Sequence, residues 1–425
     1  MADRSTDALL SYAQAADFVA ASAQRLARSR PATERVKLAA GAGRILAQTL
    51  YADSDQPPFA RSTRDGYACR AAEISSHRLL AVTGATRAGD APSGPLPRHA
   101  VWEIMTGAPV PRGADAVVMI EHVERAGTTA ETAIRLVSPR TIKKGENIVA
   151  RGAQARKGAA LLTAGAHIGA AQIALAASCG ARELAVYARP RVAILSTGDE
   201  LVAIAAKPGP GQIRNSSSAM LAAMVRAAGG EPWIRPIARD TAKSLDAAIA
   251  RAREADLLLI TGGVSAGKSD LVEPALARAG ARFHFTGVRI QPGKPVVFGE
   301  LRRRSTKQIQ SQNSTKCLGL PGNPVSSAVT FLLFAAPILA ALAGRIDRGP
   351  RFAQARLTEE VKARPGLTRF LPAACTFTAP VPEVALVQWQ GSGDLAAMAR
   401  ANCYLVVPED SQLLEAGATA GILLP

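Results

Sequence analysis

Three short apolar runs, each followed directly by a loop of glycine and small polar residues, constrain the fold of this chain most strongly. The runs and their loops are 191–195 before 196–200, 256–260 before 261–267, and 317–320 before 321–327. Helical patterns separate them at 217–228 and 242–254. Short apolar strands that alternate with helices predict a parallel, doubly wound sheet. Ligands bind such sheets beyond the carboxyl ends of the strands, so the three loops predict a single binding site.

The rest of the chain changes character at positions that predict further domains. A chain of 425 residues is too long for one hydrophobic core. Segments 7–50 and 160–188 are rich in alanine and predict helix. We expect an α/β multidomain protein in which a small β-rich module interrupts a helical and extended N-terminal domain, with a barrel-like β domain at the C-terminus. The predicted boundaries are 1–50 with 150–188 for the N-terminal domain, 51–149 for the β-rich module, 189–343 for the sheet domain and 344–425 for the C-terminal domain.

The net charge of +17, from 51 Lys and Arg against 34 Asp and Glu, allows two interpretations. A basic surface can bind nucleic acid or another polyanion. The basic residues are dispersed, however, and their one dense cluster, between Arg302 and Lys316, lies in a stretch of Gln, Ser and Thr that is typical of a solvated loop. Aromatic residues make up only 4%, too few for a stacking platform for single strands. We therefore expect no nucleic-acid partner.

Cysteine, histidine and apolar patterns disfavour several other classes of protein. The five cysteines are widely spaced without a C-x-x-C pair, which argues against a disulfide framework or a cysteine-based zinc site, and the five histidines are isolated. The N-terminus has Asp3 and Asp7 and no apolar signal core, so we expect a cytoplasmic protein. The apolar run 328–344 is short for a membrane span and contains Pro337, so we expect a buried helix and no membrane association.

The segment 262–269 fits the phosphate-binding pattern G-x-x-x-x-G-K-[ST], with Lys268 and Ser269 at its end. That pattern requires a helix directly afterwards, but Asp270 follows and Pro274 is close by. We find no second apolar run that ends in the lone aspartate of a nucleoside triphosphatase. The loop is therefore interpreted as backbone amides that contact a phosphate or pyrophosphate, and a triphosphatase using Lys268 stays as a weaker alternative.

Acidic residues gather at the same predicted strand ends. Glu200 follows the first run, Asp270 follows the second, and Asp240 lies between them in the sequence. Carboxylates beside a phosphate-binding edge usually hold Mg²⁺, because bare carboxylates would repel an anionic ligand. The alternative is that Asp199 and Glu200 cap a helix that begins at Leu201. Both interpretations stay open at this point.

Two rigid loops offer further contacts for an anion. The turn 291–295 holds Lys294 between prolines, with a glycine that lets a ligand approach closely. The loop 321–327 opens a helix whose N-terminal amides and serine hydroxyls suit an anion. Each has a plain alternative, namely a turn into the next strand and a capped helix start. Turn motifs at 65–68 and 105–108 carry little meaning alone.

Taken together, these strings resemble the MoeA and gephyrin E-domain family of molybdopterin molybdenumtransferases. They occur in the family's order and cover most of the chain, and the ordered set is specific although each string is weak alone. The family also carries G-G-V-S-x-G at the loop that fits the phosphate-binding pattern. The matching strings are Pro57-Pro-Phe59, Asp65-Gly-Tyr-Ala68, Ala88-Gly-Asp-Ala-Pro92, Ile104-Met-Thr-Gly-Ala-Pro109, Ser196-Thr-Gly-Asp-Glu-Leu201, Asn215-Ser-Ser217, Thr261-Gly-Gly-Val-Ser265 with Asp270, Pro292-Gly-Lys-Pro295 and Leu320-Pro-Gly-Asn-Pro324.

The resemblance implies insertion of molybdate into adenylylated molybdopterin, with release of AMP and formation of the molybdenum cofactor. Molybdate is a dianion that suits a cradle of Lys, Arg and Ser. The pyrophosphate link of the other substrate suits Mg²⁺ and backbone amides. The resemblance further implies a homodimer that associates through the discontinuous N-terminal domain. It also implies contact with the molybdopterin adenylyltransferase and with molybdoenzyme chaperones.

The resemblance also implies roles for individual residues. Glu200, Asp240 and Asp270 would be catalytic, and Glu200 and Asp270 would bind the metal. Asp65 and Thr106 would also be catalytic and would approach the same cleft from the β-rich module of the partner subunit. The implied contacts to the pterin and adenylate are Ser196, Thr197, Gly198, Asn215, Ser216, Gly262, Gly263, Ser265, Pro321, Gly322 and Asn323. The implied contacts to molybdate are Lys294, Pro295, Ser326, Arg369 and Ser392.

The chain departs from the family pattern at several positions. Arg64 stands where methionine is common, Gln154 where aspartate is usual, and Gln291 where lysine often opens the loop. A late serine near Ala397 is missing. The departures either weaken or retune the activity, so a degenerate pterin-binding or scaffold protein stays as one alternative. Adenylylation of molybdopterin by ATP is another. We expect the insertion activity, because the implied carboxylates and Lys294 remain.

Overall fold

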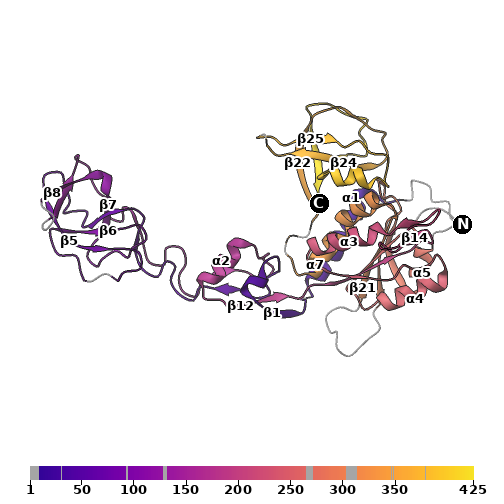
Figure 1. Cartoon of the computed structure of the whole chain (residues 1–425), viewed down its shortest axis with the longest axis horizontal. Helices are drawn as coiled ribbons and strands as arrows, with labels where there is room; N and C mark the ends of the chain where they lie inside the picture. The colour runs from indigo at the N-terminus through magenta and orange to yellow at the C-terminus, as the bar shows by residue number, and fades with distance from the viewer. Residues whose placement is uncertain are drawn as a thin grey trace. The chain divides into compact units, whose positions relative to one another are not determined.

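The chain divides into two compact units (Figure 1). The first comprises Met1–Ala47, Gly165–Gly169 and Leu184–Pro425, and the second comprises Gln48–Ala164 and Ala170–Glu183. Each unit has its own sheets and its own buried cores. The computed structural model describes residues 9–29, 31–91, 94–127, 132–264, 271–302, 314–345, 347, 349–378 and 380–425.

A six-stranded sheet in the order β16–β13–β17–β21–β20–β18 is the centre of the first unit. β16, β13, β17 and β21 are parallel, as predicted, whereas β20 and β18 are antiparallel to their neighbours. A parallel pair needs a crossover of about a dozen residues, and the segment 287–296 between β18 and β20 is shorter. The sheet is therefore mixed at this edge. Its strands are β13 (Arg191–Ser196), β16 (Glu231–Ile234), β17 (Leu257–Thr261), β18 (Ala281–Thr286), β20 (Val297–Arg302) and β21 (Ser314–Leu320).

Helices cover both faces of this sheet, because alternate residues of a strand point to opposite sides. Val192 and Ile194 of β13 belong to one core with α1, α3, α6 and α7. Ala193 and Leu195 belong to a second core with α4 and α5. The doubly wound arrangement predicted from the sequence is confirmed (Figure 1). The helices are α1 (Tyr12–Ala27), α3 (Ser216–Ala227), α4 (Ala242–Ala252), α5 (Val272–Arg278), α6 (Pro324–Thr330) and α7 (Ala336–Leu342).

The apolar run of the sequence is a helical stretch in the first core. Pro324–Leu342 is long and apolar enough to cross a membrane by length and composition, yet 94% of its 18-residue apolar window is buried inside the protein. Pro337 has no N–H to donate to the carbonyl four residues earlier, and a π-helical turn η4 (Phe331–Ala335) lies directly before α7. The predicted buried helix is confirmed.

Two of the predicted helices in the N-terminal segments form. α1 begins after Ser11, whose hydroxyl accepts a hydrogen bond from the N–H of Gln14, while the Gln14 side chain accepts one from the N–H of Ser11. This capping box fixes the start of the helix. α2 (Ala170–Ser178) ends just before Gly180, which has φ +72° and stops the helix as predicted.

Extended backbone replaces the predicted helix after α1. β1 (Thr33–Lys37) pairs with β12 (Glu183–Tyr187), and a short 3-10 turn η2 (Leu38–Gly41) follows. The helix predicted over 7–50 is therefore wrong beyond α1, and the helix predicted over 160–188 is wrong outside α2, because Ala160–Leu162 and Glu183–Tyr187 are strands. Pro31 disfavours helix in the residue before it, and the β-branched Thr33 and Val36 fit a strand better than a helix.

The second unit contains a six-stranded sheet in the order β7–β4–β6–β5–β9–β8. Tyr67, Val101 and Val118 are fully buried in its core. This β-rich character agrees with the prediction from the sequence. The strands are β4 (Gly66–Cys69), β5 (Leu80–Thr86), β6 (Ala100–Ile104), β7 (Ala116–Met119), β8 (Val123–Gly127) and β9 (Thr132–Leu136), with the turn η3 (Ile120–His122) and two short ribbons that pair β2 (Leu50–Tyr51) with β11 (Ala160–Leu162) and β3 (Arg61–Ser62) with β10 (Ile148–Val149).

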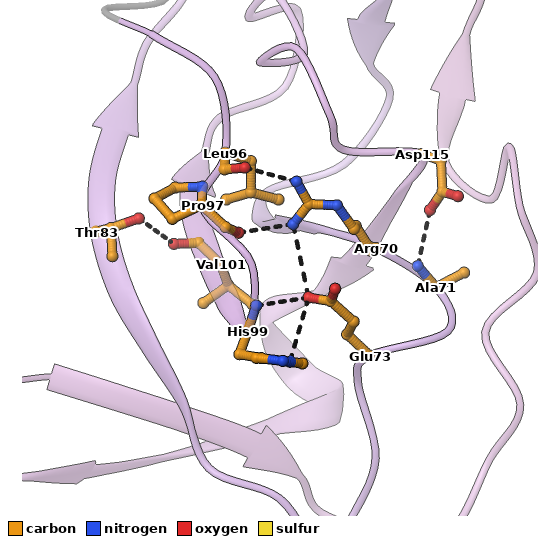
Figure 2. A network of polar contacts seen from close by, with 9 residues as sticks. All are labelled: Arg70, Ala71, Glu73, Thr83, Leu96, Pro97, His99, Val101 and Asp115. Atoms are coloured by element: carbon orange, nitrogen blue, oxygen red, sulfur yellow. Dashed lines mark hydrogen bonds and ion pairs between the residues drawn. The ribbon is translucent and has the colours of Figure 1, made fainter.

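A polar network closes one end of this second sheet (Figure 2). The Arg70 guanidinium donates to the carbonyls of Leu96 and Pro97, both at 2.6 Å. The carboxylate of Glu73 accepts from the N–H of His99 at 2.7 Å and lies 3.6 Å from Arg70. His99 has φ +59°, which a non-glycine residue adopts at a cost, and the bond to Glu73 offsets part of that cost.

The C-terminal residues of the first unit form a closed β domain. β24 pairs with β25 on one side and with β26 on the other, so the order β24–β25–β22–β28–β26 returns to its start. The two residues of β19 add to β24 in parallel. The predicted C-terminal β domain is confirmed (Figure 1). The remaining elements are β14 (Leu201–Val202), β15 (Ile213–Arg214), β19 (Ile290–Gln291), β22 (Arg351–Leu357), β23 (Val361–Lys362), β24 (Thr368–Thr376), β25 (Glu383–Leu386), α8 (Leu395–Arg400), β26 (Cys403–Val407), β27 (Leu413–Leu414) and β28 (Thr419–Leu424).

Candidate active site

The loops that follow β13, β17 and β21 meet at one edge of the sheet. Ser196 is paired with Thr261, and Thr261 with Leu320, at the strand ends. Beyond them, the N–H of Thr197 donates to the carbonyl of Thr261 at 3.0 Å, and the N–H of Gly262 donates to the carbonyl of Leu320 at 3.2 Å. Three segments that are far apart in the sequence are thereby tied side by side, as the strand pattern predicted.

Glycine is required where these turns stack on one another. Gly262 has φ +95°, and a Cβ built there would lie 2.3 Å from the carbonyl oxygen of Thr197. A Cβ on Gly322 would lie 3.4 Å from the Cα of Gly262. A side chain at Gly262 would therefore push the first two turns apart, so the rim depends on this glycine.

A cavity of about 1110 Å³ opens at this rim. That volume is slightly above the range of about 300–1,000 Å³ that is usual for small-molecule and cofactor sites. The wall comes from the strand-end loops, from the turn around Lys294 and from two segments of the C-terminal β domain. The predicted residues that line it are Ser196, Thr197, Gly198, Glu200, Asn215, Ser216, Asp240, Gly262, Gly263, Lys294, Pro295, Pro321, Gly322, Asn323, Ser326 and Ser392.

A buried polar network supports the first loop. The Ser196 hydroxyl lies 2.8 Å from the hydroxyl of Ser218 and donates to Asn215 Oδ1 at 3.2 Å. Asn215 also caps α3, because its Oδ1 accepts from the N–H of Ser218. The Thr197 hydroxyl donates to Asp240 Oδ1 at 2.6 Å and so fixes one carboxylate of the cavity wall. Ser196 and Asn215 thus hold the rim, whatever further contact they make to a ligand.

Four charged side chains line the cavity within the described part of the chain. They are the carboxylates Glu200 and Asp240 and the cations Arg214 and Lys294. Leu201 begins strand β14, so Glu200 does not cap a helix and that alternative is wrong. Opposite charges on one wall suit a ligand that carries phosphate groups and a bound cation together.

The turn that carries Lys294 is fixed from several directions. β19 pairs with β24 just before it, and the N–H of Val288 donates to the Lys294 carbonyl at 2.9 Å. Gly293 has φ +114°, and a Cβ there would lie 2.5 Å from Thr330 Cγ2, so the turn packs closely on helix α6. Lys294 itself is exposed, which leaves its ammonium group free to meet a ligand.

The helix start at 323–327 and the C-terminal β domain meet beside this turn. Asn323 Nδ2 donates to the Ser392 hydroxyl at 2.8 Å, and the N–H of Val325 donates to the Ser392 carbonyl at 3.1 Å. Asn323 makes no side-chain cap of its own helix. The buried Ser326 lines the cavity one position after Val325. These contacts bring Ser326 and Ser392 to the same wall as predicted.

Arg369 lies beside the cavity and does not line it, although the resemblance implied a contact with molybdate. Its Nε donates to Gln291 Oε1 at 2.9 Å, and its Nη1 donates to the carbonyls of Arg364 and Leu367. Gln291 is one of the positions that depart from the family pattern. The role of Arg369 as a ligand stays a prediction.

Asp65 and Thr106 lie in the second unit and pair with each other. Asp65 Oδ1 accepts from the N–H of Thr106 at 2.6 Å and from its hydroxyl at 2.8 Å. These two bonds, the backbone one first, hold the pKa of the Asp65 carboxyl below its usual value. The two turn motifs, which carry little meaning separately, are therefore joined by hydrogen bonds that keep the Asp65 carboxylate ionised and oriented.

Ser265, Lys268 and Asp270 lie outside the described residues, so their predicted roles stay predictions. The first helix described after that loop, α5, begins at Val272. Among the described residues, no group of three or more His, Cys, Asp or Glu side chains is placed to hold a metal ion.

Sequence reasoning missed part of the wall. Leu367, Trp389 and Leu395 of the C-terminal β domain line the cavity, as does Arg214 beside the asparagine that caps α3. The three apolar residues belong to segments with no motif that links them to the strand-end loops. Arg214 directly precedes the predicted Asn215, so its position next to a matched string was the only signal available.

The fold and the cavity together define a class: an α/β protein with a large cavity beyond the carboxyl ends of parallel strands, where sheets of this kind bind their ligands. Three family patterns match the chain in order. Residues 10–180 match the MoeA N-terminal region (domain I and II), residues 193–341 a probable molybdopterin binding domain, and residues 354–424 the MoeA C-terminal region (domain IV). The chain belongs to the MoeA family.

Relatives and solved structures agree along almost the whole chain. A protein of Nostoc sp. named molybdopterin molybdenumtransferase is 32% identical over 93% of this chain and 89% of its own length. The protein of that name from Haemophilus influenzae is 32% identical over 92% of this chain and 93% of its own. The crystal structure of a molybdopterin biosynthesis MoeA protein from Pyrococcus horikoshii is 30% identical, with a TM-score of 0.72 over 98% of this chain and 99% of that one.

Proposed function

We propose that this chain is an enzyme of molybdenum cofactor biosynthesis that inserts molybdate into adenylylated molybdopterin and releases AMP. The observation that carries the proposal is the convergence of three strand-end loops on one cavity with cations and carboxylates on its wall. Relatives named molybdopterin molybdenumtransferase match at about 30% identity or more over nearly the full chain, which supports the same activity.

The cavity wall supports a division of labour between its two sides. Lys294, Pro295, Ser326 and Ser392 would hold the oxometallate, because an ammonium and two hydroxyls supply charge-assisted hydrogen bonds to its oxygens. The loops 196–200, 261–264 and 321–323 would hold the pterin and adenylate through backbone amides and small side chains. Release of AMP breaks the pyrophosphate link, and positioned donors stabilise the charge that develops on its oxygens.

Mg²⁺ fits the donors on this wall. It commonly takes one or two protein carboxylates and completes its shell with water and substrate phosphate. Glu200 and Asp240 both line the cavity, and Asp240 is oriented by the Thr197 hydroxyl. Glu200 with Asp270 remains the proposed ligand pair, to which Asp240 is added as a third oxygen donor. When bound, the ion would neutralise phosphate charge.

We further propose a cytoplasmic homodimer with the four-domain division predicted from the sequence. The N-terminal domain would dimerise, Asp65 and Thr106 would be supplied by the second subunit, and the molybdopterin adenylyltransferase and molybdoenzyme chaperones would be partners. The Asp65 carboxylate is ionised and oriented by Thr106, which suits it to a role in charge stabilisation. Adenylylation by ATP and a non-catalytic scaffold role are not favoured, because the relatives bear the transferase name over the full chain.

The direct test is release of AMP from adenylylated molybdopterin. The purified chain, molybdate and Mg²⁺ are expected to release AMP without ATP, and chelation of the metal is expected to slow the reaction. Lys268→Ala serves as a control for the triphosphatase alternative and is expected to leave the rate unchanged. No AMP release from a folded protein that binds the substrate would refute the proposal in favour of a scaffold.

The origin of Asp65 is tested by mixing two inactive variants. Asp65→Asn and Lys294→Met proteins are denatured and refolded together, so that mixed dimers form at random. If the second subunit supplies Asp65, part of the activity returns, because one cavity in each mixed dimer regains both residues. If Asp65 serves its own subunit, that same dimer has no intact site and the mixture stays inactive.

A further inference from the structure

The turn that bears Lys294 is joined to the C-terminal β domain by one pair of side chains. Gln291 and Arg369 are directly opposite each other where β19 pairs with β24. Arg369 Nε donates to Gln291 Oε1 at 2.9 Å. The bond therefore connects the first residue of the 291–295 turn to a strand of the closed β domain.

The same guanidinium also holds a second piece of the cavity wall. Arg369 Nη1 donates to the carbonyl of Leu367 at 3.2 Å and to that of Arg364. Gln291 and Leu367 line the cavity, whereas Arg369 does not. One planar group, whose donors are fixed relative to each other, thus sets the spacing between two wall segments that are far apart in the sequence.

We infer that Gln291 and Arg369 form a clasp that positions Lys294 for a tetrahedral oxyanion, and that Arg369 is a positioning residue rather than a ligand. The inference rests on the proposed function, in which Lys294 meets molybdate. Arginine has donors only, so the clasp needs an acceptor at position 291, and the glutamine amide oxygen supplies it.

The geometry of the turn explains why one hydrogen bond matters there. Gly293 is packed against Thr330, and the carbonyl of Lys294 is bonded to the N–H of Val288, so those contacts fix the end of the turn. Its beginning is fixed by the two-residue pairing of β19 with β24 and by the clasp. Without the clasp, only the two-residue pairing of β19 with β24 holds the first half of the turn in place.

Hydrogen exchange tests the clasp without any activity measurement. Gln291→Leu removes the acceptor, Arg369→Met removes the donor and keeps the stem, and Gln291→Glu keeps an acceptor. We expect amide exchange in 288–296 to rise about three- to tenfold in both single variants, the effect of one lost hydrogen bond of about 0.5–1.5 kcal/mol. The double variant is expected to exchange no faster than the faster single variant, and Gln291→Glu is expected to match the parent.

Arg356→Met is the matched control, because Arg356 lies in the same β domain, is ion-paired with Glu383 and lies outside the cavity wall. It is expected to leave exchange in 288–296 unchanged. Melting curves show whether each variant folds. If Arg369→Met does not fold, the exposed Gln291 carries the test alone through its Leu and Glu variants.

Kinetics of AMP release separate a positioning role from a ligand role. A clasp predicts that Gln291→Leu and Arg369→Met raise the KM for molybdate by similar factors, about three- to tenfold, and that the effects do not add. A large rise in KM with Arg369→Met and none with Gln291→Leu would overturn the inference in favour of a ligand, and so would unchanged exchange in both variants. If the parent releases no AMP, the proposed function fails, while the exchange result still decides the clasp.

Discussion

One sheet carries two charged clusters that differ in what faces them. At the carboxyl ends of β13, β17 and β21, charged residues such as Glu200 and Lys294 line a cavity. At the antiparallel edge, Glu300 of β20 accepts from Lys316 Nζ and from Arg282 Nη2, with His284 Nε2 at 3.5 Å. The second cluster satisfies its charges internally, and the first leaves them available to a ligand.

The difference follows from strand direction. In the antiparallel pairs, Arg282 is directly opposite Glu300, and Glu300 directly opposite Lys316, so side chains on one face meet at each register position. Parallel strands bring their ends together instead, and the loops beyond those ends carry the charges. The comparison predicts that the edge cluster contributes mainly to stability and the rim cluster mainly to ligand binding.

The largest expected effect is on the rim. Lys294→Met is expected to lower kcat/KM for AMP release about 10²–10³-fold, the loss of one positioned donor to a developing charge. The melting temperature should stay within about 2 °C, because Lys294 is exposed. Calorimetry measures the melting temperature and the AMP assay measures kcat/KM on the same sample. Equal losses of stability and activity would contradict the comparison.

At the antiparallel edge we expect the opposite result, a loss of stability without a loss of activity. Glu300→Gln leaves the nearly buried Lys316 without its carboxylate partner and is expected to cost about 3 kcal/mol of unfolding free energy. Urea denaturation measures this loss. The rate of AMP release by the folded variant should match the parent at low temperature. Glu383→Gln, which removes an exposed pair with Arg356, is the control and should cost well under about 1 kcal/mol.

A change at Gly262, the glycine between the stacked turns, should lower both stability and substrate binding. It therefore tests whether the two properties can be separated at the rim. Gly262→Ala places a methyl group 2.3 Å from the Thr197 carbonyl at a backbone φ of +95°. We expect a cost of about 2 kcal/mol and a loss of substrate affinity as the turns separate. Gly280→Ala has a similar φ of +82° and open space around it, so it measures backbone strain alone. Similar affinities in the two variants would show that the stacked turns do not shape the cavity.

A pH titration of stability tests the assignment of the edge cluster more finely. Burial opposes ionisation of Glu300, but the hydrogen bonds from Lys316 and Arg282 outweigh it and lower its pKa from 4.5 to about 2. A carboxyl whose pKa is lower in the folded state adds stability above pH 4.5, and loses it as pH falls toward 2. The stability difference between the parent and Glu300→Gln should therefore shrink over that range in urea titrations. A constant difference would exclude this carboxylate as its source.

Much of the fold, and about half of the residues that line the cavity, could be predicted from the sequence. The apolar runs and their loops predicted β13, β17 and β21 and their common edge, because side-chain period and helix alternation are local properties. The helix predicted beyond α1 failed, because composition was read without the proline and β-branched residues that favour β1. The mixed edge was missed because strand direction depends on how the connection closes.

The sequence determined which segments form strands and helices, and that three glycine-rich turns share the end of one sheet, because those features depend on neighbours along the chain. Only the tertiary structure decided that Leu367, Trp389 and Leu395 complete the cavity wall and that Arg369 bonds to Gln291. Those contacts join the closed β domain to the loops of another sheet. No periodic pattern relates the two, so their meeting is fixed by how the domains pack.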